Sequence, residues 1–426
     1  MSPFPLDRRG FLAALAAAPL LAAVLQACSS GDTGDGAATD ERRSQVARAA
    51  ADPALGAAAA QAVNLFGTDL YRALAAARPT ANLVLSPASI AIAVSMAAAG
   101  AVGTTLDEMV ATLRADEVDL HPAMNALETG LTARNRPDVE LAIANATWLH
   151  DALAVDAAFL DVLASQYGSG VELVDFERNA EAARKRINEW VADRTNDRIS
   201  ELIPPDMLDE LTRFVLVNSV YLNARWTDEF DPQLTRDAPF TTATGDTVDV
   251  ATMAMQATLP YATGDGWQAV ELAYVGDELA MLLFLPEPDF LGTFEEIFLV
   301  TDATQYLAPR LARVLLPRWD TASSFSLADQ LGALGMPTAF TGAADFSSIT
   351  TDIRLRIASV IHQANITVGE TGTEAAAATA VEAATTGAPP EDEPVELIFD
   401  RPFVFAIRDR VSGAVLFLGR VADPRG

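Results

Sequence analysis

Apolar side chains recur at helical spacing through the first half of the chain. Between residues 57 and 74 they lie three or four positions apart, which places them on one face of an α-helix. A second helix is expected over residues 86–100, because Ser86 suits an N-cap and Pro87 suits the first turn. Residues 180–195 show the same spacing and predict a third helix.

The second half of the chain carries the pattern of β-strands. Residues 214–222 and 279–285 are near-continuous apolar runs, as expected of strands that are buried on both faces. Residues 357–368 alternate, and residues 403–407 and 415–421 are expected to pair across a turn. Helices first and strands later, in one block, predict an α+β fold rather than alternating βαβ units.

One histidine interrupts the apolar face of the alternating strand. His362 is the sole polar group on that face, whose other members are Ala358, Val360, Ala364, Ile366 and Val368. The pattern fits a core histidine whose hydrogen bonds are satisfied. It also fits a polar lock that holds strands together or apart.

Residues 369–394 break the strand pattern. They are rich in alanine and threonine, end in prolines and acids, and contain almost no bulky apolar side chain. This composition suits a flexible surface loop or a loose alanine helix. If the segment were extended, however, one side would carry only small uncharged groups, namely Thr373, Ala375, Ala377, Thr379 and Val381. The opposite side would carry the charges Glu370, Glu374 and Glu382, so the segment is also a latent half-buried strand.

The N-terminus has the pattern of an export signal over residues 1–27. Arg8 and Arg9 precede an alanine-rich apolar run that is too short to span a bilayer, as in a twin-arginine signal peptide. Cys28 follows where bacterial lipoproteins are acylated, and it is the only cysteine in the chain. The alternative is a plain secretory signal with an accidental cysteine. We expect an exported, extracytoplasmic protein that is attached to the membrane of the cell envelope through a lipid on Cys28.

Two further regions are expected after the signal peptide. Small polar residues and glycine after Cys28 predict a flexible tether over residues 28–55. Residues 56–426 show no second linker and no fixed-period repeat, so we expect them to form one folded domain.

Composition narrows the function classes. The net charge of −29 argues against nucleic acid as a partner, because phosphate binding needs a basic patch. A single cysteine and three distant histidines, His121, His150 and His362, give no zinc-cluster spacing, so no metal is expected. No motif of a familiar hydrolase or nucleotide-binding enzyme is present, and no cofactor is expected.

Four runs of sequence resemble motifs of the serpin family, in the family's order and at its intervals. They are residues 82–90, residues 214–226 with 230–232, residues 360–364 with 370–375, and residues 401–405 with 416–420. The resemblance covers essentially all of residues 56–426. It implies the serpin fold, in which N-terminal helices pack on a large mixed β-sheet with further sheets, and an exposed reactive-centre loop at about residues 370–394.

The resemblance also implies two polar sites in that sheet. A network beneath the middle of the sheet, the shutter, would consist of Ser86, Ser89, Asn218 and His362. The breach, where the loop first enters the sheet, would contain Trp226, Arg318 and Glu370. An ion pair between Arg318 and Glu370 would act as a latch there. Serpins usually carry lysine at the position of Arg318, so the arginine is a mild departure.

Inhibitory serpins share a hinge of glycine, threonine and a run of small residues, whereas non-inhibitory relatives tend to carry bulky, charged or proline residues there. The corresponding hinge in this chain is Glu370, Gly372, Thr373, Ala375, Ala376, Ala377 and Ala378. Small side chains lower the steric barrier to sliding between strands, so this hinge implies inhibition by loop insertion.

Counting from the hinge as in the family places the cleaved bond between Thr386 and Gly387, to within a few positions, since the loop from Gly372 to Pro402 is about five residues longer than in the family. A threonine at this position suits a serine protease with a small neutral primary pocket, such as an elastase-like or subtilisin-like enzyme. No lysine or arginine lies between Gly369 and Arg401, which argues against a trypsin-like target.

The expected mechanism is suicide inhibition by a monomer. The protease cleaves the loop and is trapped as an acyl-enzyme while the loop inserts into the sheet. Three alternatives stay open at this point. They are a non-inhibitory serpin that acts as a carrier or structural lipoprotein, an enzyme, and an inhibitor that binds tightly without being cleaved.

Overall fold

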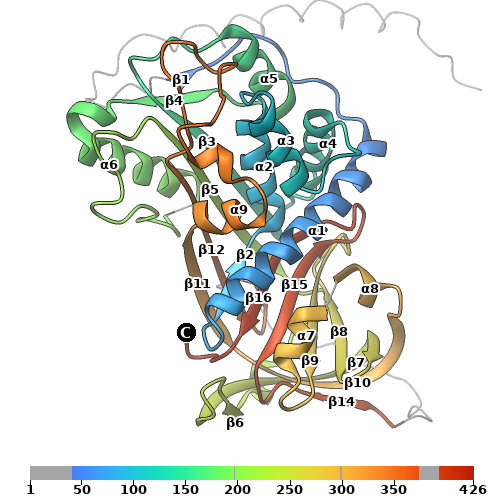
Figure 1. The fold of residues 1–426 in the computed structure, drawn as a ribbon. Helices are drawn as coiled ribbons and strands as arrows, with labels where there is room; N and C mark the ends of the chain where they lie inside the picture. The colour runs from blue at the N-terminus through green and yellow to red at the C-terminus, as the bar shows by residue number, and fades with distance from the viewer. Residues whose placement is uncertain (1–40, 196, 298–299, 374–392) are drawn as a thin grey trace, which may run out of the picture. The chain divides into compact units, whose positions relative to one another are not determined.

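The computed structural model describes residues 41–195, 197–297, 300–373 and 393–426 (Figure 1). Strands and helices form two sheets with helices packed between and around them. The predicted α+β class is confirmed.

The first sheet, which we call sheet A, has seven strands. Their order across the sheet is β1-β4-β3-β5-β13-β12-β11. Their bounds are β1 Glu41–Arg42, β4 Val171–Val174, β3 Val139–His150, β5 Phe214–Arg225, β13 Gly372–Thr373, β12 Ser359–Gly369 and β11 Trp319–Ser326. β5 lies at the middle of this order and β12 lies next to the edge strand β11. They are the strands that the apolar run and the alternating pattern predicted.

The second sheet, sheet B, has nine strands in the order β14-β10-β7-β8-β9-β15-β16-β2, with β6 paired to β7. Their bounds are β14 Val395–Ile398, β10 Ala308–Pro317, β7 Thr247–Gly264, β8 Trp267–Ala273, β9 Leu279–Pro286, β15 Phe403–Asp409, β16 Val415–Val421, β2 Leu83–Leu85 and β6 Arg236–Thr241. β15 and β16 pair antiparallel, as their sequence predicted.

Nine α-helices and two 3₁₀-helices occur in the described residues. Their bounds are α1 Pro53–Ala77, α2 Pro87–Ala98, α3 Thr104–Thr112, α4 Leu120–Thr132, α5 Ala157–Tyr167, α6 Phe176–Arg194, α7 Leu291–Ile297, α8 Val300–Thr304, α9 Ala328–Leu334, η1 Pro232–Leu234 and η2 Pro337–Phe340. In this described part of the chain, no helix combines the length and apolar character needed to cross a membrane.

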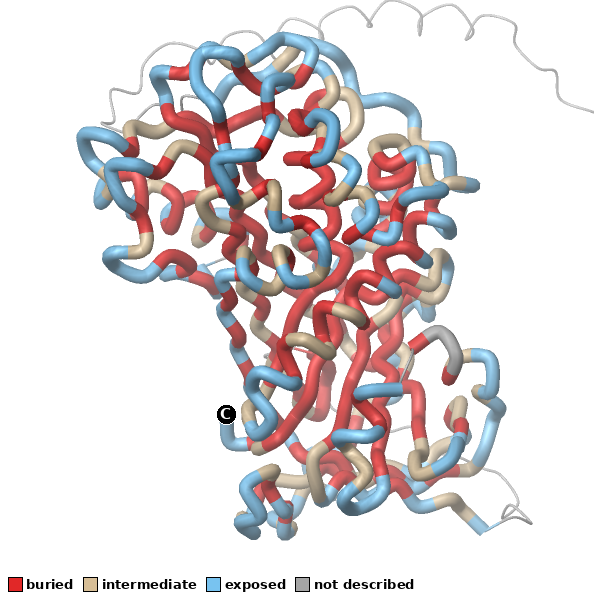
Figure 2. The backbone as a smooth tube through the Cα atoms, in the orientation of Figure 1, coloured by how far each residue is buried: buried red, intermediate tan, exposed pale blue. Residues whose placement is uncertain are grey.

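Helix α2 lies at the centre of the core. All twelve of its residues are buried, because it packs against β3 and β5 of sheet A and against β16 of sheet B. A helix that is apolar on every side is expected only in such a position. Ser86 caps it by accepting a hydrogen bond from the backbone N–H of Ser89, and Pro87 follows in the first turn. In Figure 2 the buried positions run along α2, β15 and β16.

Helix α6 covers the opposite face of sheet A. Its apolar side chains, among them Ile187 and Trp190, form a second core with Val215 and Val217 of β5 and Ile361 of β12. Alternate residues of β5 and β12 therefore face α2 and α6. β5 is buried on both faces, which explains its near-continuous apolar sequence. β12 alternates over its second half, because every other residue there is only half-buried.

The N-terminal part of the described chain corrects the expected tether. Residues 41–55 were expected to be flexible, but Glu41 and Arg42 pair with Glu172 and Val171 as an additional edge strand of sheet A. Further along, the backbone N–H of Ala49 donates to the carbonyl oxygen of Ser165 at 2.7 Å. Backbone pairing and arginine contacts hold this segment. Neither kind of contact requires apolar residues at regular spacing. The composition of the segment alone therefore suggested a linker.

Arg48 makes the main side-chain contact of this segment. Its Nε donates to Asn125 at 2.8 Å and its Nη2 lies 2.6 Å from a carboxylate oxygen of Glu128 on α4. Burial raises the pKa of Glu128, although Arg48 acts in the opposite direction. The carboxylate is therefore a partly desolvated charge with one cationic partner.

We predict that Arg48→Ala lowers the free energy of unfolding by about 2 kcal/mol at pH 8, because it leaves this carboxylate without its partner. Arg43→Ala is the matched control, since Arg43 is exposed and its side chain has one hydrogen-bond partner among the described residues, Gly168 O at 2.5 Å. The control is expected to stay within about 0.5 kcal/mol of the wild type. Urea denaturation measures both values, and equal losses in the two variants would contradict the prediction.

Candidate functional site

The candidate site is the seam between β5 and β12 in sheet A. Residues 359–364 of β12 pair in parallel with residues 215–220 of β5, and this direct pairing ends at Ala364. Further along, β13 lies between the same two strands and pairs antiparallel with both. Thr373 is the partner of Val368 on one side and of Ala224 on the other. The seam is thus closed by direct pairing at one end and occupied by Gly372 and Thr373 at the other.

The backbone at position 372, where the chain comes in between β12 and β5, requires glycine. Its φ is +154°, and a Cβ atom added to it would lie 2.1 Å from the carbonyl oxygen of Ala224 and 2.8 Å from the Cα of Arg225. Real Cβ atoms do not approach backbone so closely. Only glycine therefore allows the chain to turn in beside β5 here.

Thr373 is the next residue and is 1% exposed. Its Oγ1 lies 2.6 Å from the hydroxyl oxygen of Tyr274, and burial raises the pKa of Tyr274 well above its usual value. The Tyr274 ring stacks on Trp226, with 4.5 Å between ring centroids and 13° between planes. Two buried aromatic rings and a hydroxyl pair thus hold the Thr373 side chain.

Glu370 lies at the turn that precedes β13. Its Oε1 accepts hydrogen bonds from Nε of Arg318 at 2.8 Å and from Oγ1 of Thr235 at 2.5 Å. Arg318 Nη2 also contacts this oxygen. Burial alone would raise the pKa of Glu370, but the bonds from Arg318 and Thr235 outweigh it and lower the pKa. The carboxylate is therefore charged at neutral pH.

Backbone bonds fix the same turn. Trp226 donates from its indole Nε1 to the carbonyl oxygen of Gly369 at 3.0 Å, and its backbone N–H donates to the carbonyl oxygen of Thr371 at 2.9 Å. The N–H of Phe230 donates to the carbonyl oxygen of Glu370 at 2.9 Å. The residues predicted for the breach, Trp226, Arg318 and Glu370, are therefore brought together in space.

A second polar group lies where β5 and β12 pair directly. His362 contacts Asn218 through Nδ1, and its Nε2 accepts a hydrogen bond from the backbone N–H of Ser86 at 3.1 Å. Asn218 Nδ2 in turn contacts Ser89 Oγ and Asn145 Oδ1. We call these five residues the His362 cluster. It contains all four residues predicted for the shutter, together with Asn145.

The chemistry of His362 follows from these partners. Because Nε2 accepts from a backbone N–H, the proton is assigned to Nδ1, which donates to Oδ1 of Asn218. Burial lowers the pKa of His362 to about 3. The ring is therefore neutral at physiological pH, and both of its nitrogens are hydrogen-bonded.

Three members of these sites escaped the sequence reasoning. Asn145 lies on β3 directly across from Asn218, which is the cross-strand partner of His362. The sequence could have indicated it, because Asn145 is a polar residue between apolar neighbours on both sides. Tyr274 and Thr235 gave no signal, because their contacts depend on how distant segments pack. The predicted hinge residues Ala375, Ala376, Ala377 and Ala378, the bond between Thr386 and Gly387, and the lipid site Cys28 lie outside the described residues.

The fold and these contacts define an α+β protein whose main sheet contains a two-residue strand, β13, between β5 and β12. The family model described as serpin (serine protease inhibitor) matches residues 61–424. The chain belongs to the serpin family.

Individual relatives agree with this assignment. An uncharacterized serpin-like protein of Thermococcus kodakarensis is 35% identical over 372 residues, which cover 85% of each chain. The leukocyte elastase inhibitor of Bos taurus is 33% identical over 371 residues, covering 84% of this chain and 97% of that protein. The structure of thyroxine-binding globulin in complex with thyroxine is similar at a TM-score of 0.77 and 27% identity, over 86% of this chain and 99% of that chain.

We predict that Gly372→Ala drives β13 out of the seam, because the added Cβ would collide with the backbone of β5. Backbone hydrogen exchange at Gly372 and Thr373 should rise at least ~10-fold, and the free energy of unfolding should fall by about 2 kcal/mol. Gly369→Ala is the matched control, since a Cβ there meets no atom within 4 Å. If both variants exchange like the wild type, the steric argument is wrong.

The pKa of His362 predicts a loss of stability in acid. The unfolded chain takes up a proton on this histidine below about pH 6.5, whereas the native ring stays neutral down to about pH 3. The free energy of unfolding therefore decreases as the pH falls through this window. Protonation of this one histidine in the unfolded chain accounts for a decrease of about 2 kcal/mol between pH 7.5 and pH 5. The lowered pKa of Glu370 adds a loss of the same sign at lower pH.

His362→Gln should remove this contribution and flatten the profile of unfolding free energy between pH 7.5 and pH 5. Burial also lowers the pKa of His121, so His121→Gln measures that share separately. A profile as steep in His362→Gln as in the wild type would show that His362 is not the group responsible.

Proposed function

We propose that this serpin inhibits a serine protease as a suicide substrate, by inserting its cleaved loop into sheet A. The observation that carries the proposal is the position of Gly372 and Thr373, which already lie between β5 and β12. In this proposal Trp226, Arg318 and Glu370 form the breach. Ser86, Ser89, Asn218 and His362 form the shutter.

The covalent step is acyl transfer. The protease serine oxygen attacks the carbonyl carbon of Thr386, the bond to the nitrogen of Gly387 breaks, and that nitrogen leaves as an amine after taking up a proton. The chain that ends at Thr386 is now an ester of the protease. It is free to enter the seam because its far end is no longer tied to β14.

The register of β13 indicates what insertion must displace. Thr373 is opposite Val368 and Ala224, so an antiparallel strand continued by six residues places Thr379 opposite His362 and Asn218. These two residues now face each other directly. Insertion therefore has to break the contact between His362 and Asn218, and the hydroxyl of Thr379 enters in its place.

The same register explains the composition of the loop. Residues 375, 377, 379 and 381 would continue the face of Thr373, which is buried against Tyr274. Alanine, threonine and valine at these positions fit a space that the β12 residues around Ala364 already fill closely. A large or charged side chain would have to be buried without a partner, which is costly.

The proposed target is an elastase-like or subtilisin-like serine protease. A threonine at the cleaved bond suits a small neutral pocket, and the relative in Bos taurus carries the name leukocyte elastase inhibitor. We further propose that the protein is an exported monomer, held at the cell envelope by a lipid on Cys28.

Incubation with pancreatic elastase and with subtilisin tests the proposal. We expect a complex that resists SDS and a large rise in melting temperature after cleavage of the loop. Cleavage without a complex and with an unchanged melting temperature would overturn the proposal and favour a non-inhibitory carrier. An inactive complex with an intact loop would overturn it in favour of a tight-binding inhibitor.

We predict that Thr373→Arg converts the inhibitor into a substrate. The arginine would have to enter a position that is 1% exposed and lined by Tyr274, so insertion slows and water releases the protease. The fraction of protease recovered in the SDS-resistant complex should fall at least ~10-fold, equivalent to about 1.4 kcal/mol in the partition. Glu393→Arg is the control, since Glu393 is exposed and follows the cleaved bond. Equal loss of complex in both variants would contradict a role for the inserted side chain.

A further inference from the structure

His150 is buried in a way that the proposed function does not explain. It is the last residue of β3 and is 6% exposed. Its Nδ1 is buried and has no hydrogen-bond partner in the part of the chain that the structure describes. Leaving a buried polar atom unpaired costs about 1–3 kcal/mol. We therefore expect a partner for this nitrogen that the described residues do not supply.

Carboxylates surround the His150 ring. Asp151 Oδ1 lies 3.6 Å from Nδ1, and Glu177 Oε2 lies 3.6 Å from Nε2. One ligand atom each from His150, Asp151 and Asp175 lie within 4.8 Å of one another. The unpartnered Nδ1 therefore faces the Asp151 carboxylate, while Nε2 faces that of Glu177.

The fold brings these residues together through two parallel strands. β3 and β4 end side by side at His150 and Val174, and an aspartate follows each strand directly. The backbone N–H of Asp151 donates to the carbonyl oxygen of Val174 at 3.0 Å, which fixes the first turn. Asp175 caps α6 by accepting from the backbone N–H of Arg178 at 2.9 Å, which fixes the second.

Two arginines face this group, and they leave part of its charge unpaired. Arg213 Nη2 lies 2.9 Å from Glu177 Oε2, so Glu177 has a cationic partner. Arg178 Nη1 is 3.9 Å from Asp175 Oδ2, but the Arg178 side chain is 89% exposed and screened by water. Asp151 has no cation within 4 Å other than the His150 ring among the described residues.

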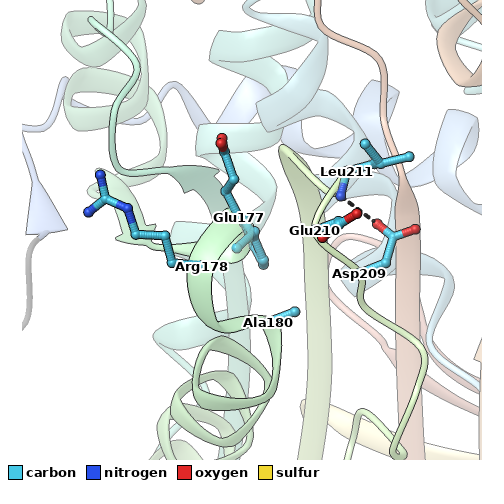
Figure 3. A pocket seen from close by; sticks show the side chains of 7 residues that line it. Glu177, Arg178, Ala180, Asp209, Glu210 and Leu211 are labelled. Carbon is cyan, nitrogen blue, oxygen red and sulfur yellow. Dashed lines mark hydrogen bonds between the residues drawn. The ribbon is translucent and has the colours of Figure 1, made fainter.

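The surface beside the group is also acidic. Glu177 belongs to the rim of a hollow of about 470 Å³, which is lined by Phe176, Glu177, Arg178, Ala180, Asp209, Glu210 and Leu211. In Figure 3 the side chains of Glu177 and Arg178 leave the start of α6 in different directions, while Asp209 and Glu210 lie across the hollow. Three carboxylates around this opening favour the approach of a cation.

We propose that His150, Asp151 and Asp175 bind a divalent transition-metal ion of the zinc class. An imidazole nitrogen with two carboxylate oxygens suits zinc, cobalt or nickel, whereas magnesium and calcium prefer oxygen ligands alone. Zinc bonds to these atoms are about 2.0–2.2 Å long, so ligand atoms now up to 4.8 Å apart must close by a small side-chain rotation. Asp151 has that freedom, since its side chain is 45% exposed.

The site would join the end of β3 to the start of α6, the helix that lies over β5 and β12. Histidine spacing argued against a metal site in the sequence, but that argument considered only clusters of histidine and cysteine. Metal binding at this site does not depend on protease inhibition. An experiment can therefore contradict one of the two proposals and leave the other unaffected.

The test is titration of the protein, without a polyhistidine tag, with Zn²⁺ by calorimetry and with Co²⁺ by visible absorbance. All samples are produced without the lipid and carry Cys28→Ser, because the thiol of an unmodified Cys28 would itself be a zinc and cobalt ligand. We expect one ion per chain, a cobalt band typical of nitrogen and oxygen ligands, and a melting temperature that rises with Zn²⁺ but not with Mg²⁺.

Three variants locate the ion. His150→Gln and Asp175→Asn should each weaken binding at least ~10-fold, and asparagine keeps the N-cap of α6, so Asp175→Asn is expected to fold normally. His121→Gln is the matched control and should bind like the parent protein. No binding at millimolar Zn²⁺, or equal binding in His150→Gln and the parent, would overturn the proposal. A loss of binding in His121→Gln that matches the loss in His150→Gln would overturn it as well.

Discussion

His362 donates a hydrogen bond from Nδ1 to Asn218 across the seam between β12 and β5, and the arrangement of sheet A depends on this contact. The ring is fully buried and neutral, so it needs a donor partner and an acceptor partner inside the protein. Asn218 supplies the acceptor and the backbone N–H of Ser86 supplies the donor. Ser86 also caps α2, so one residue positions the central helix and completes the contact between the strands.

The two ends of the seam between β5 and β12 are stabilised by different interactions. At the closed end, each hydrogen bond of the His362 cluster is worth only about 1 kcal/mol net. At the entry, Gly372 and Thr373 already pair with both neighbours, so every further residue that follows would gain ladder bonds on two sides. In the proposed mechanism a strand of many residues outweighs a few side-chain bonds. The closed seam is then a kinetic barrier rather than the lowest free energy.

Local periodicity carried most of the fold prediction. The strand of β12 was recognisable because Ala364, Ile366 and Val368 alternate with polar residues, and in the structure these three are buried while the polar residues between them are half-buried. The edge strand at Glu41 and the contact between Tyr274 and Thr373 were not predictable in this way. Both depend on the register between segments that are far apart in sequence, and a local pattern does not contain that information. The serpin resemblance supplied part of it for the four predicted shutter residues, but not for Asn145.

The chain between β13 and the proposed cleaved bond contains enough residues to fill the seam. If β13 continued in its present register, residue 382 would be opposite Ser359, the first residue of β12, and also opposite Val215 of β5. Thr386 lies four residues beyond residue 382. In the proposed mechanism, complete insertion therefore uses the whole seam and carries the acylated residue past its far end. Glu382 would then be the last residue opposite β12, and the proposed cleaved bond would lie beyond the end of the seam.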